Sequence, residues 1–191
     1  MNQSPNPAVI STDTLTGDMH PIRRAVLSVG SNLGDRMSAL QGAVDALADT
    51  PEVWITAISP VYETEPVDAP AGSDNFLNAV IALDTTLSAR TLLERAHAIE
   101  AAYGRERGES VPTNAPRTLD VDLIVVGDRH ADEESLRLPH PRAAERAFVL
   151  APWHDVESDA ELPGRGPIAE LLAELGLDGV VRRDDLVLEV Q

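Results

Sequence analysis

The chain has 191 residues, and 43% of them are apolar, which is enough to fill the core of one domain. Its formal net charge of −17 disfavours binding to nucleic acid, because a negative surface repels a phosphate backbone. All 15 basic residues are arginine and no cysteine is present, so a P-loop lysine, a disulfide and a thiolate metal site are excluded. The sequence shows neither an apolar run of about 20 residues nor a secretory signal, so we expect a cytoplasmic protein with no membrane partner.

The first quarter of the chain is predicted to hold an extension, a strand and a helix. Residues 1–22 are rich in Pro, Asn, Ser and Thr, and we expect them to form a flexible extension ahead of one domain, 23–191. The apolar run 25–29 predicts a buried strand. Asp35 can cap a helix that continues to about Ala48, with its apolar residues on one face.

The rest of the chain alternates between extended and helical patterns. An extended segment with a bend at Pro60 is predicted over 54–62, and a strand over 76–83 follows a proline-rich loop. Ser88 can cap a second helix, which Gly104 ends. Further elements are expected over 119–126 (strand), 168–175 (helix) and 186–190 (extended). The order β-α-β-β-α-β is typical of a ferredoxin-like α+β sandwich, here with C-terminal additions.

Two carboxylates lie two residues apart within the strand predicted over 119–126. Because alternate side chains of a strand share a face, Asp120 and Asp122 are predicted to project the same way. Two like charges so close together need a cation, and hard oxygen ligands suit Mg²⁺, including a pair of ions. The alternative is a strand with one solvated face, and the spacing alone does not decide between them.

Three arginines fall in the polar loop that precedes this strand: Arg105, Arg107 and Arg117. A loop of this kind beside a carboxylate pair can close over a triphosphate and exclude water. An ordinary solvated loop is the alternative.

An aromatic ring and an amide share a face of the strand over 76–83. Phe76 could stack on a flat heterocycle while Asn78 pairs with its edge, although core packing is the more usual fate of a phenylalanine. His140 lies between two prolines and either donates to a phosphate or is a plain loop residue.

Six segments of the chain, taken together and in order, resemble one family, the 6-hydroxymethyl-7,8-dihydropterin pyrophosphokinases of folate synthesis. That family has a ferredoxin-like fold, in agreement with the predicted element order. The matching segments are LSVGSNLGDR (27–36), VYETEPV (61–67), NFLNAVIAL (75–83), IE..YGRER (99–107), PRTLDVDLIVVG (116–127) and LPHPRAAERAFVLAPW (138–153).

The resemblance implies an enzyme that transfers diphosphate from ATP to hydroxymethyl-dihydropterin with two Mg²⁺ ions. These small molecules are the partners it implies, and we expect the enzyme to be a monomer. Asp120 and Asp122 are implied as ligands of both ions, and Arg105 and Arg117 as catalytic arginines. The residues implied to bind the nucleotide are Glu100, Arg107, Leu123, His140 and Arg146.

The resemblance also implies a pterin site. Phe76 and Phe148 would stack on the two faces of the ring, and Asn78 would pair with its edge. The other implied positions are backbone groups around Thr64, Pro66 and Val67, and a turn at Gly30 and Asn32 beneath the site.

One segment departs from the family pattern. Members commonly have Arg-Trp-Gly-Pro-Arg before the aspartate strand, whereas this chain has TNAPR over 113–117. An inactive homologue that still binds pterin or ATP therefore remains an alternative, as does a nucleotidyl transferase that releases pyrophosphate. A ferredoxin-like binding module is a third alternative, against which the acidic composition argues.

Overall fold

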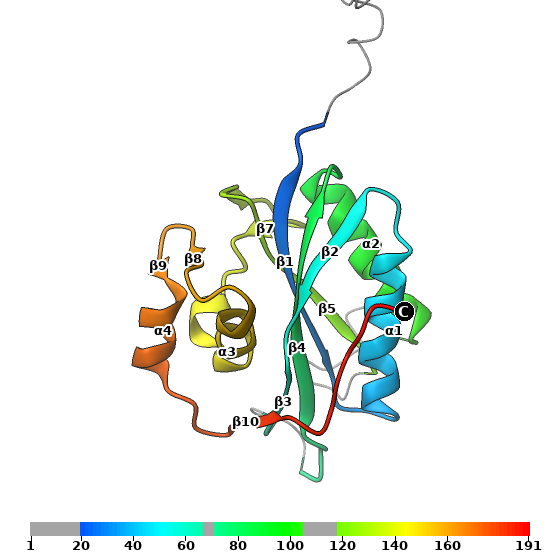
Figure 1. Ribbon diagram of the computed structural model, residues 1–191, viewed down its shortest axis with the longest axis vertical. Helices are drawn as coiled ribbons and strands as arrows, with labels where there is room; N and C mark the ends of the chain where they lie inside the picture. Colours follow the sequence, from blue (N-terminus) through cyan, green and yellow to red (C-terminus); the bar gives the residue numbers. More distant parts are fainter. Residues whose placement is uncertain (1–19, 67–70, 105–117) are drawn as a thin grey trace, which may run out of the picture.

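The computed structural model of the protein describes residues 20–66, 71–104 and 118–191. Its centre is a six-stranded antiparallel sheet in the order β10-β3-β4-β1-β5, in which β2 also pairs with β4 (Figure 1). The strands of this sheet are β1 (Arg23–Ser31), β2 (Val53–Ile58), β3 (Val61–Thr64), β4 (Phe76–Thr85), β5 (Asp120–Val126) and β10 (Val180–Arg183).

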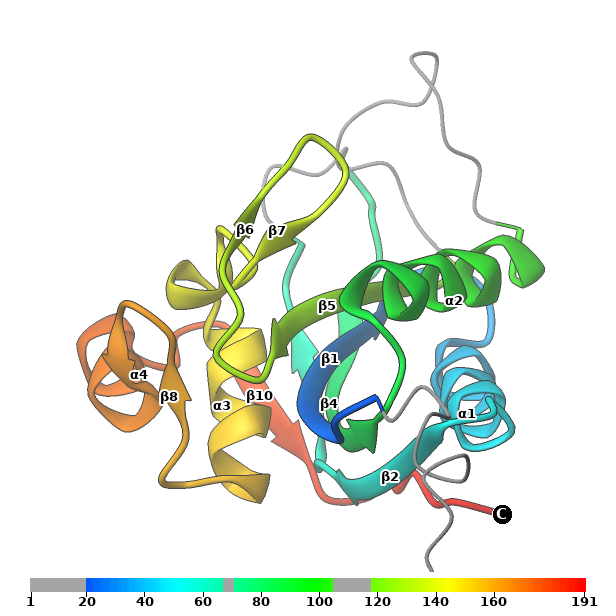
Figure 2. The ribbon, with the colours of Figure 1, turned by 90° about the horizontal axis from the view of Figure 1, so that it is seen from above.

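Helices cover both faces of the sheet. One face carries α1 (Arg36–Ala48) and α2 (Ala89–Ala102), and the other carries α3 (Ala147–Val156), against whose outer side α4 (Ile168–Leu175) packs (Figure 2). No helix among the described residues is both long and apolar enough to cross a bilayer. The smaller elements are β6 (Ala131–Asp132), β7 (Arg137–Leu138), the 3-10 turn η2 (Ala143–Glu145), β8 (Glu161–Leu162) and β9 (Gly166–Pro167).

Side chains of the central strands alternate between two cores. Leu27 of β1 and Ile81 of β4 pack in the core beneath α1 and α2. Their neighbours Val26 and Val80 pack in the core on the α3 and α4 side, together with Trp153. This alternation fixes which face each polar residue of a strand occupies.

The predicted ferredoxin-like sandwich is confirmed, and so are its helices. Asp35 caps α1, where its Oδ1 accepts a hydrogen bond from Ser38 N at 3.0 Å. Ser88 caps α2, where its Oγ accepts from Thr91 N at 3.1 Å. The helix predicted over 168–175 is α4. Each of these signals is local in sequence, which is why the predicted helix ends agree closely with the observed ones.

One prediction for the extended segments is confirmed and one needs correction. The segment over 54–62 is extended and is interrupted at Pro60 as predicted, so it forms two strands, β2 and β3, which both pair with β4. The final extended piece over 186–190 forms no strand, and the strand lies earlier, as β10. The segment that follows β10 is instead hydrogen-bonded to α1. Gln41 Nε2 donates to Glu189 O at 2.6 Å, and Glu189 N donates to Gln41 Oε1 at 3.2 Å.

Candidate active site

Four strands bring polar residues to one end of the sheet. Gly30, near the end of β1, is paired with Asn78 on one side and with Asp120 on the other. Ser28 is paired with Asp122, and Phe76 at the start of β4 is paired with Thr64 at the end of β3. The candidate active site therefore extends across β3, β4, β1 and β5 at this end.

Both aspartates face the α3 side of the sheet. A register shift opposite Val26 and Leu27 places an extra residue in β5. Beyond it, Leu123 and Val121 pack in the core beneath α1 and α2. Asp120 and Asp122 alternate with them and so project to the opposite face, as their spacing predicted. Bulges are common next to active sites, where they re-aim side chains.

A basic side chain approaches the aspartate pair from the turn before α3. Arg146 Nη1 lies 3.4 Å from Asp122 Oδ2, and the Asp122 side chain is 37% exposed. Burial lowers the pKa of Arg146, and the neighbouring Asp122 carboxylate opposes that shift. Arg146 also lies over the ring of Phe148, 5.5 Å from its centroid. One arginine thus contacts both an aspartate and an aromatic ring of the candidate site.

Glu100 lies beneath the aspartate strand. Its side chain is only 1% exposed, and its Oε1 accepts a hydrogen bond from Val121 N at 2.9 Å. Val121 separates the two aspartates, so Glu100 holds the backbone from which both of them project. Leu123 is 5% exposed and belongs to the core under α1 and α2.

His140 is fixed by its backbone next to the same strand. Its N donates to Ile124 O at 2.8 Å, and its Nδ1 accepts from Arg142 N at 3.2 Å. Burial lowers the pKa of His140, and Arg146 and Arg142 act in the same direction, while Asp122 opposes them. The ring is therefore neutral at pH 7, with its proton assigned to Nε2 because Nδ1 accepts.

The other half of the candidate site centres on a buried amide. Asn78 Nδ2 donates to Thr64 Oγ1 at 2.8 Å, and the two residues are 3% and 6% exposed. A Cβ atom built on Gly30 would lie 2.8 Å from Asn78 Oδ1, so only glycine leaves the amide in this position. Phe76 and Phe148 are half-buried. The amide is thus held in one orientation by Thr64.

The sequence profile of the family described as 7,8-dihydro-6-hydroxymethylpterin-pyrophosphokinase matches residues 26–158. The chain belongs to this family. A pyrophosphokinase of that kind from Pseudomonas aeruginosa is 38% identical over 161 residues, which are 84% of this chain and 97% of the relative. One from Mycobacterium tuberculosis is 45% identical over 165 residues, covering 80% of this chain and 84% of the relative.

A solved structure supports the fold. A Plasmodium falciparum HPPK-DHPS triple mutant with pteroate superposes with a TM-score of 0.64 at 12% identity. The match covers 86% of this chain and 47% of that one, so the present chain spans about half of that protein's length. At this level of identity the likeness concerns the fold alone.

Several residues assigned to the pyrophosphokinase site lie outside the described residues: Arg105, Arg107, Arg117 and Val67. The departure over 113–117 lies there as well. Pro66 is described and half-buried, directly after Glu65 beyond the end of β3. Asn32 is buried, and its Nδ2 lies 3.4 Å from Asp74 O.

The sequence analysis missed a set of charged residues around β3: Arg36, Glu63, Asp155, Arg182 and Arg183. They come from four separate segments, so no motif unites them. The run Arg182-Arg183-Asp184-Asp185 is the one sequence signal that could have indicated these contacts. If the two adjacent arginines lie on a strand, their side chains project to opposite faces of the sheet.

Proposed function

We infer that this protein transfers diphosphate from ATP to 6-hydroxymethyl-7,8-dihydropterin, giving AMP and the pterin diphosphate in folate biosynthesis. One observation in the structure carries the assignment. The aspartate pair of β5 and the buried amide of β4 occupy the same end of the sheet, on either side of Gly30. A phosphate-binding half and a heterocycle-binding half are therefore adjacent, as transfer between two bound substrates requires.

Asp120 and Asp122 are the residues that we propose to hold two Mg²⁺ ions. They fit this role because the two carboxylates share one face of β5, where Arg146 Nη1 lies 3.4 Å from Asp122 Oδ2. Within the described residues no group of three or more acidic or histidine side chains forms a complete metal site. This agrees with Mg²⁺, which is commonly held by one or two carboxylates together with substrate phosphates. Bound there, the ions would neutralise charge that develops on the phosphates.

We propose that the pterin binds beside Asn78. The Thr64 hydroxyl accepts one amide N–H of Asn78, which leaves the second N–H and Oδ1 for the donor and acceptor edge of the heterocycle. Phe76 and Phe148 are assigned to the two faces of the ring, and backbone groups of Thr64, Pro66 and Val67 to its rim. The ring would thus be recognised by stacking and by one oriented amide.

In the proposed step, the hydroxymethyl oxygen attacks the β-phosphorus of ATP. The new O–P bond forms as the bond from that phosphorus to the bridging oxygen of AMP breaks, and the hydroxyl proton passes to water. The protein supplies alignment and positive charge. We assign Arg146 and His140 to the nucleotide phosphates, together with Arg105, Arg107 and Arg117, which lie outside the described residues. Glu100 and Leu123 are assigned to the support of the nucleotide side.

The test is an assay of the purified protein with ATP, Mg²⁺ and the dihydropterin, in which all nucleotide products are separated. We expect AMP to form in step with the pterin diphosphate. Asp122→Asn should lower the rate about 100-fold or more, because it removes charge that acts on the transferring group. Asp128→Asn is the matched control, since Asp128 is exposed in the turn after the opposite end of β5. It should leave the rate within about twofold.

Other products would contradict the assignment. Pyrophosphate would indicate nucleotidyl transfer, and ADP would indicate transfer of a single phosphoryl group. Binding of ATP or pterin without any turnover would identify an inactive homologue.

A further inference from the structure

The strand β10 lies outside the span 26–158 that the family profile matches, but it pairs with the strand that supports the pterin half of the site. Val180 is paired with Thr64, and Arg183 with Val61. Without β10, the four-residue β3 would be the edge of the sheet here. A short edge strand opens locally more readily than a paired one. The position of Thr64 therefore depends on the C-terminal segment.

Arg183 fixes β3 from the α1 side of the sheet. Its guanidinium donates to Glu63, the residue before Thr64. Arg36, the first residue of α1, donates to the same carboxylate at 3.0 Å and to Asn75 O at 2.8 Å. Asn75 directly precedes Phe76. Glu63 thus joins β10 and α1 to the end of β3 that carries Thr64, and Arg36 joins α1 to the residue before Phe76 at the start of β4.

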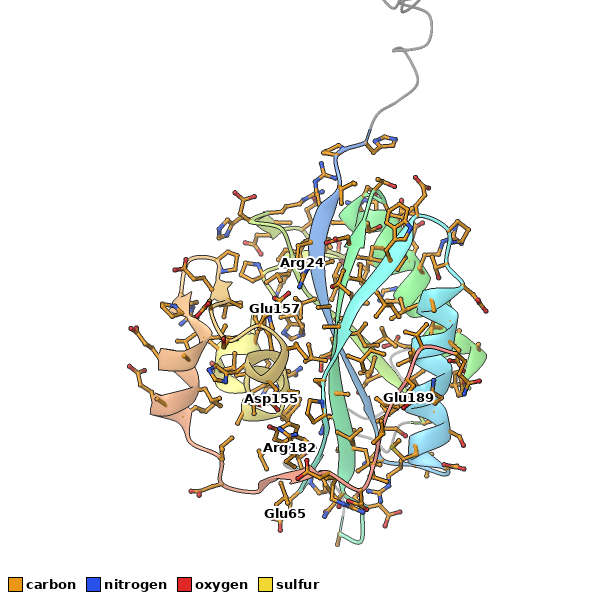
Figure 3. The ribbon with its side chains drawn as sticks, viewed as in Figure 1. Arg24, Glu65, Asp155, Glu157, Arg182 and Glu189 are labelled. Carbon is orange, nitrogen blue, oxygen red and sulfur yellow. The ribbon has the colours of Figure 1, made fainter. Side chains whose placement is uncertain are left out.

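Arg182 acts on the opposite side of the sheet. Its Nη1 lies 3.6 Å from Asp155 Oδ2 (Figure 3), and the hydroxyl of Tyr62 donates to the same oxygen at 2.6 Å. Burial and the Asp155 carboxylate raise the pKa of Tyr62 to about 12, so its hydroxyl keeps its proton.

Asp155 and Phe148 both belong to α3, seven residues apart, which is about two turns of one helix face. Tyr62 lies on β3, two residues before Thr64. The contacts of Asp155 therefore set the distance between the helix that bears Phe148 and the strand that bears Thr64. This is the gap that a flat ring would have to fit.

We propose that Arg182 and Arg183 are positioning residues for the pterin half of the site. They act from opposite faces of the sheet, through Asp155 and Glu63, and neither needs to touch a substrate. The inference rests on the proposed function, because it assigns the pterin to Asn78, Phe76 and Phe148. Three strands, β3, β4 and β1, separate the aspartate pair of β5 from β10, so the two aspartates should keep their positions without Arg182 and Arg183.

The test compares Arg182→Gln, Arg183→Gln and the double variant with the unaltered full-length chain. We expect the KM for the pterin to rise about five- to tenfold in the double variant, with the KM for ATP within about twofold. Arg183→Lys should recover part of the loss, because it keeps a charge near Glu63. Assays are run well below each variant's melting temperature, so that the folded fraction does not limit the rate.

Arg24→Gln is the matched control. Arg24 also joins the sheet to the α3 layer, through Glu157, and pairs with Asp84 of the neighbouring strand, but it lies at the opposite end of β1 from Gly30 (Figure 3). Arg24→Gln should leave the KM values for the pterin and for ATP within about twofold of those of the unaltered chain. An equal rise in the pterin KM for Arg24→Gln would overturn the inference, since any ion pair between layers would then suffice. An unchanged pterin KM in the double variant would overturn it as well.

A second readout separates this inference from the proposed reaction. Equilibrium binding of 6-hydroxymethylpterin is measured by its fluorescence, with the unaltered chain and each variant. If the unaltered chain forms no AMP, the reaction is wrong, and the positioning role is decided by binding alone. Weaker binding by the double variant than by Arg24→Gln supports the role, and equal binding refutes it.

Discussion

At the scale of single residues, Gly30 is the position where the site leaves least room. A Cβ atom there would lie 2.8 Å from Asn78 Oδ1 and 3.7 Å from a ring carbon of Phe76. No real Cβ approaches an oxygen so closely, so either the amide or β1 would have to move. Because β1 is paired on both sides, by β4 and β5, we expect the amide to move.

We therefore predict that Gly30→Ala separates the Asn78 amide from Thr64. The pterin KM should rise about tenfold or more, and overpacking should lower the free energy of unfolding by about 1–3 kcal/mol. Steady-state kinetics and urea unfolding measure the two effects. Gly30→Ala combined with Asn78→Ser should recover stability without recovering pterin affinity. Unchanged kinetics in Gly30→Ala would show that Asn78 does not recognise the pterin.

The function of Glu100 could not be predicted from its residue type alone. The family resemblance implies that Glu100 lies on the nucleotide side, and the structure places it under β5, hydrogen-bonded to Val121 N. The aspartate pair could be predicted from spacing, because alternation along a strand is local. The function of Glu100 depends on the packing of α2 against β5, which no spacing in the sequence records.

At the scale of elements, the packing of α1 on α2 depends on one glycine within a helix. A Cβ on Gly42 would lie 1.4 Å from the hydroxyl oxygen of Tyr103 and 2.4 Å from its Cζ. Tyr103 is the C-cap of α2, so its ring fills the space over α1 that Gly42 leaves open. Helix propensity therefore favours alanine at this position, whereas packing against Tyr103 favours glycine.

We predict that packing prevails in Gly42→Ala. Propensity alone would stabilise the helix by about 1 kcal/mol, whereas displacing the Tyr103 ring should cost about 1–3 kcal/mol, so the net effect is destabilising. In a Tyr103→Ala background the same substitution should become stabilising by about 1 kcal/mol. Urea unfolding of the four proteins gives both values. A stabilising Gly42→Ala in the unaltered chain would refute the packing argument.

The elements also show how far the sequence could predict this fold. Helix caps and apolar runs are local signals, and they predicted α1, α2, α4, β1 and β4 well. The strand β10 has only four residues, two of them arginine, and is a strand because β3 is available to pair with it. Pairing of this kind is decided by distant parts of the chain, so local patterns could not reveal it.

At the scale of the whole molecule, the acidic excess gives each arginine several potential partners. The chain has 32 acidic and 15 basic residues. Four arginines form ion pairs with acidic side chains of other segments of the chain: Arg24, Arg36, Arg182 and Arg183. The contacts of Arg24, Arg36 and Arg182 join the sheet to a helix layer, whereas Arg183 joins two strands, β10 and β3. Three of the four arginines make these contacts around β3. Ion pairs between exposed groups contribute little, so Glu63 should matter most, because it pairs with two arginines that are themselves partly buried.

Glu63 gives the molecule a pH dependence that can be predicted in sign. Burial alone would raise the pKa of Glu63, but hydrogen bonds from Arg36 and Arg183 outweigh it and hold the pKa below its ordinary value. In the unfolded chain the pKa returns to about 4.3. A group whose pKa is lower in the folded state than in the unfolded state stabilises the fold at pH values above its unfolded pKa. That contribution is lost as the pH falls through the folded pKa.

We therefore predict that Glu63→Gln lowers the free energy of unfolding by about 1 kcal/mol at pH 7, and that most of this difference is lost at about pH 2. Urea unfolding at a series of pH values measures it. Glu65→Gln serves as control, because Glu65 is an exposed residue just beyond β3 and should give no comparable difference at either pH (Figure 3). A difference for Glu63→Gln that stays constant down to pH 2 would mean that the side chain acts through packing. The ion pairs with Arg36 and Arg183 would then not hold β3 in place, and the role proposed for Arg183 would lose its mechanism.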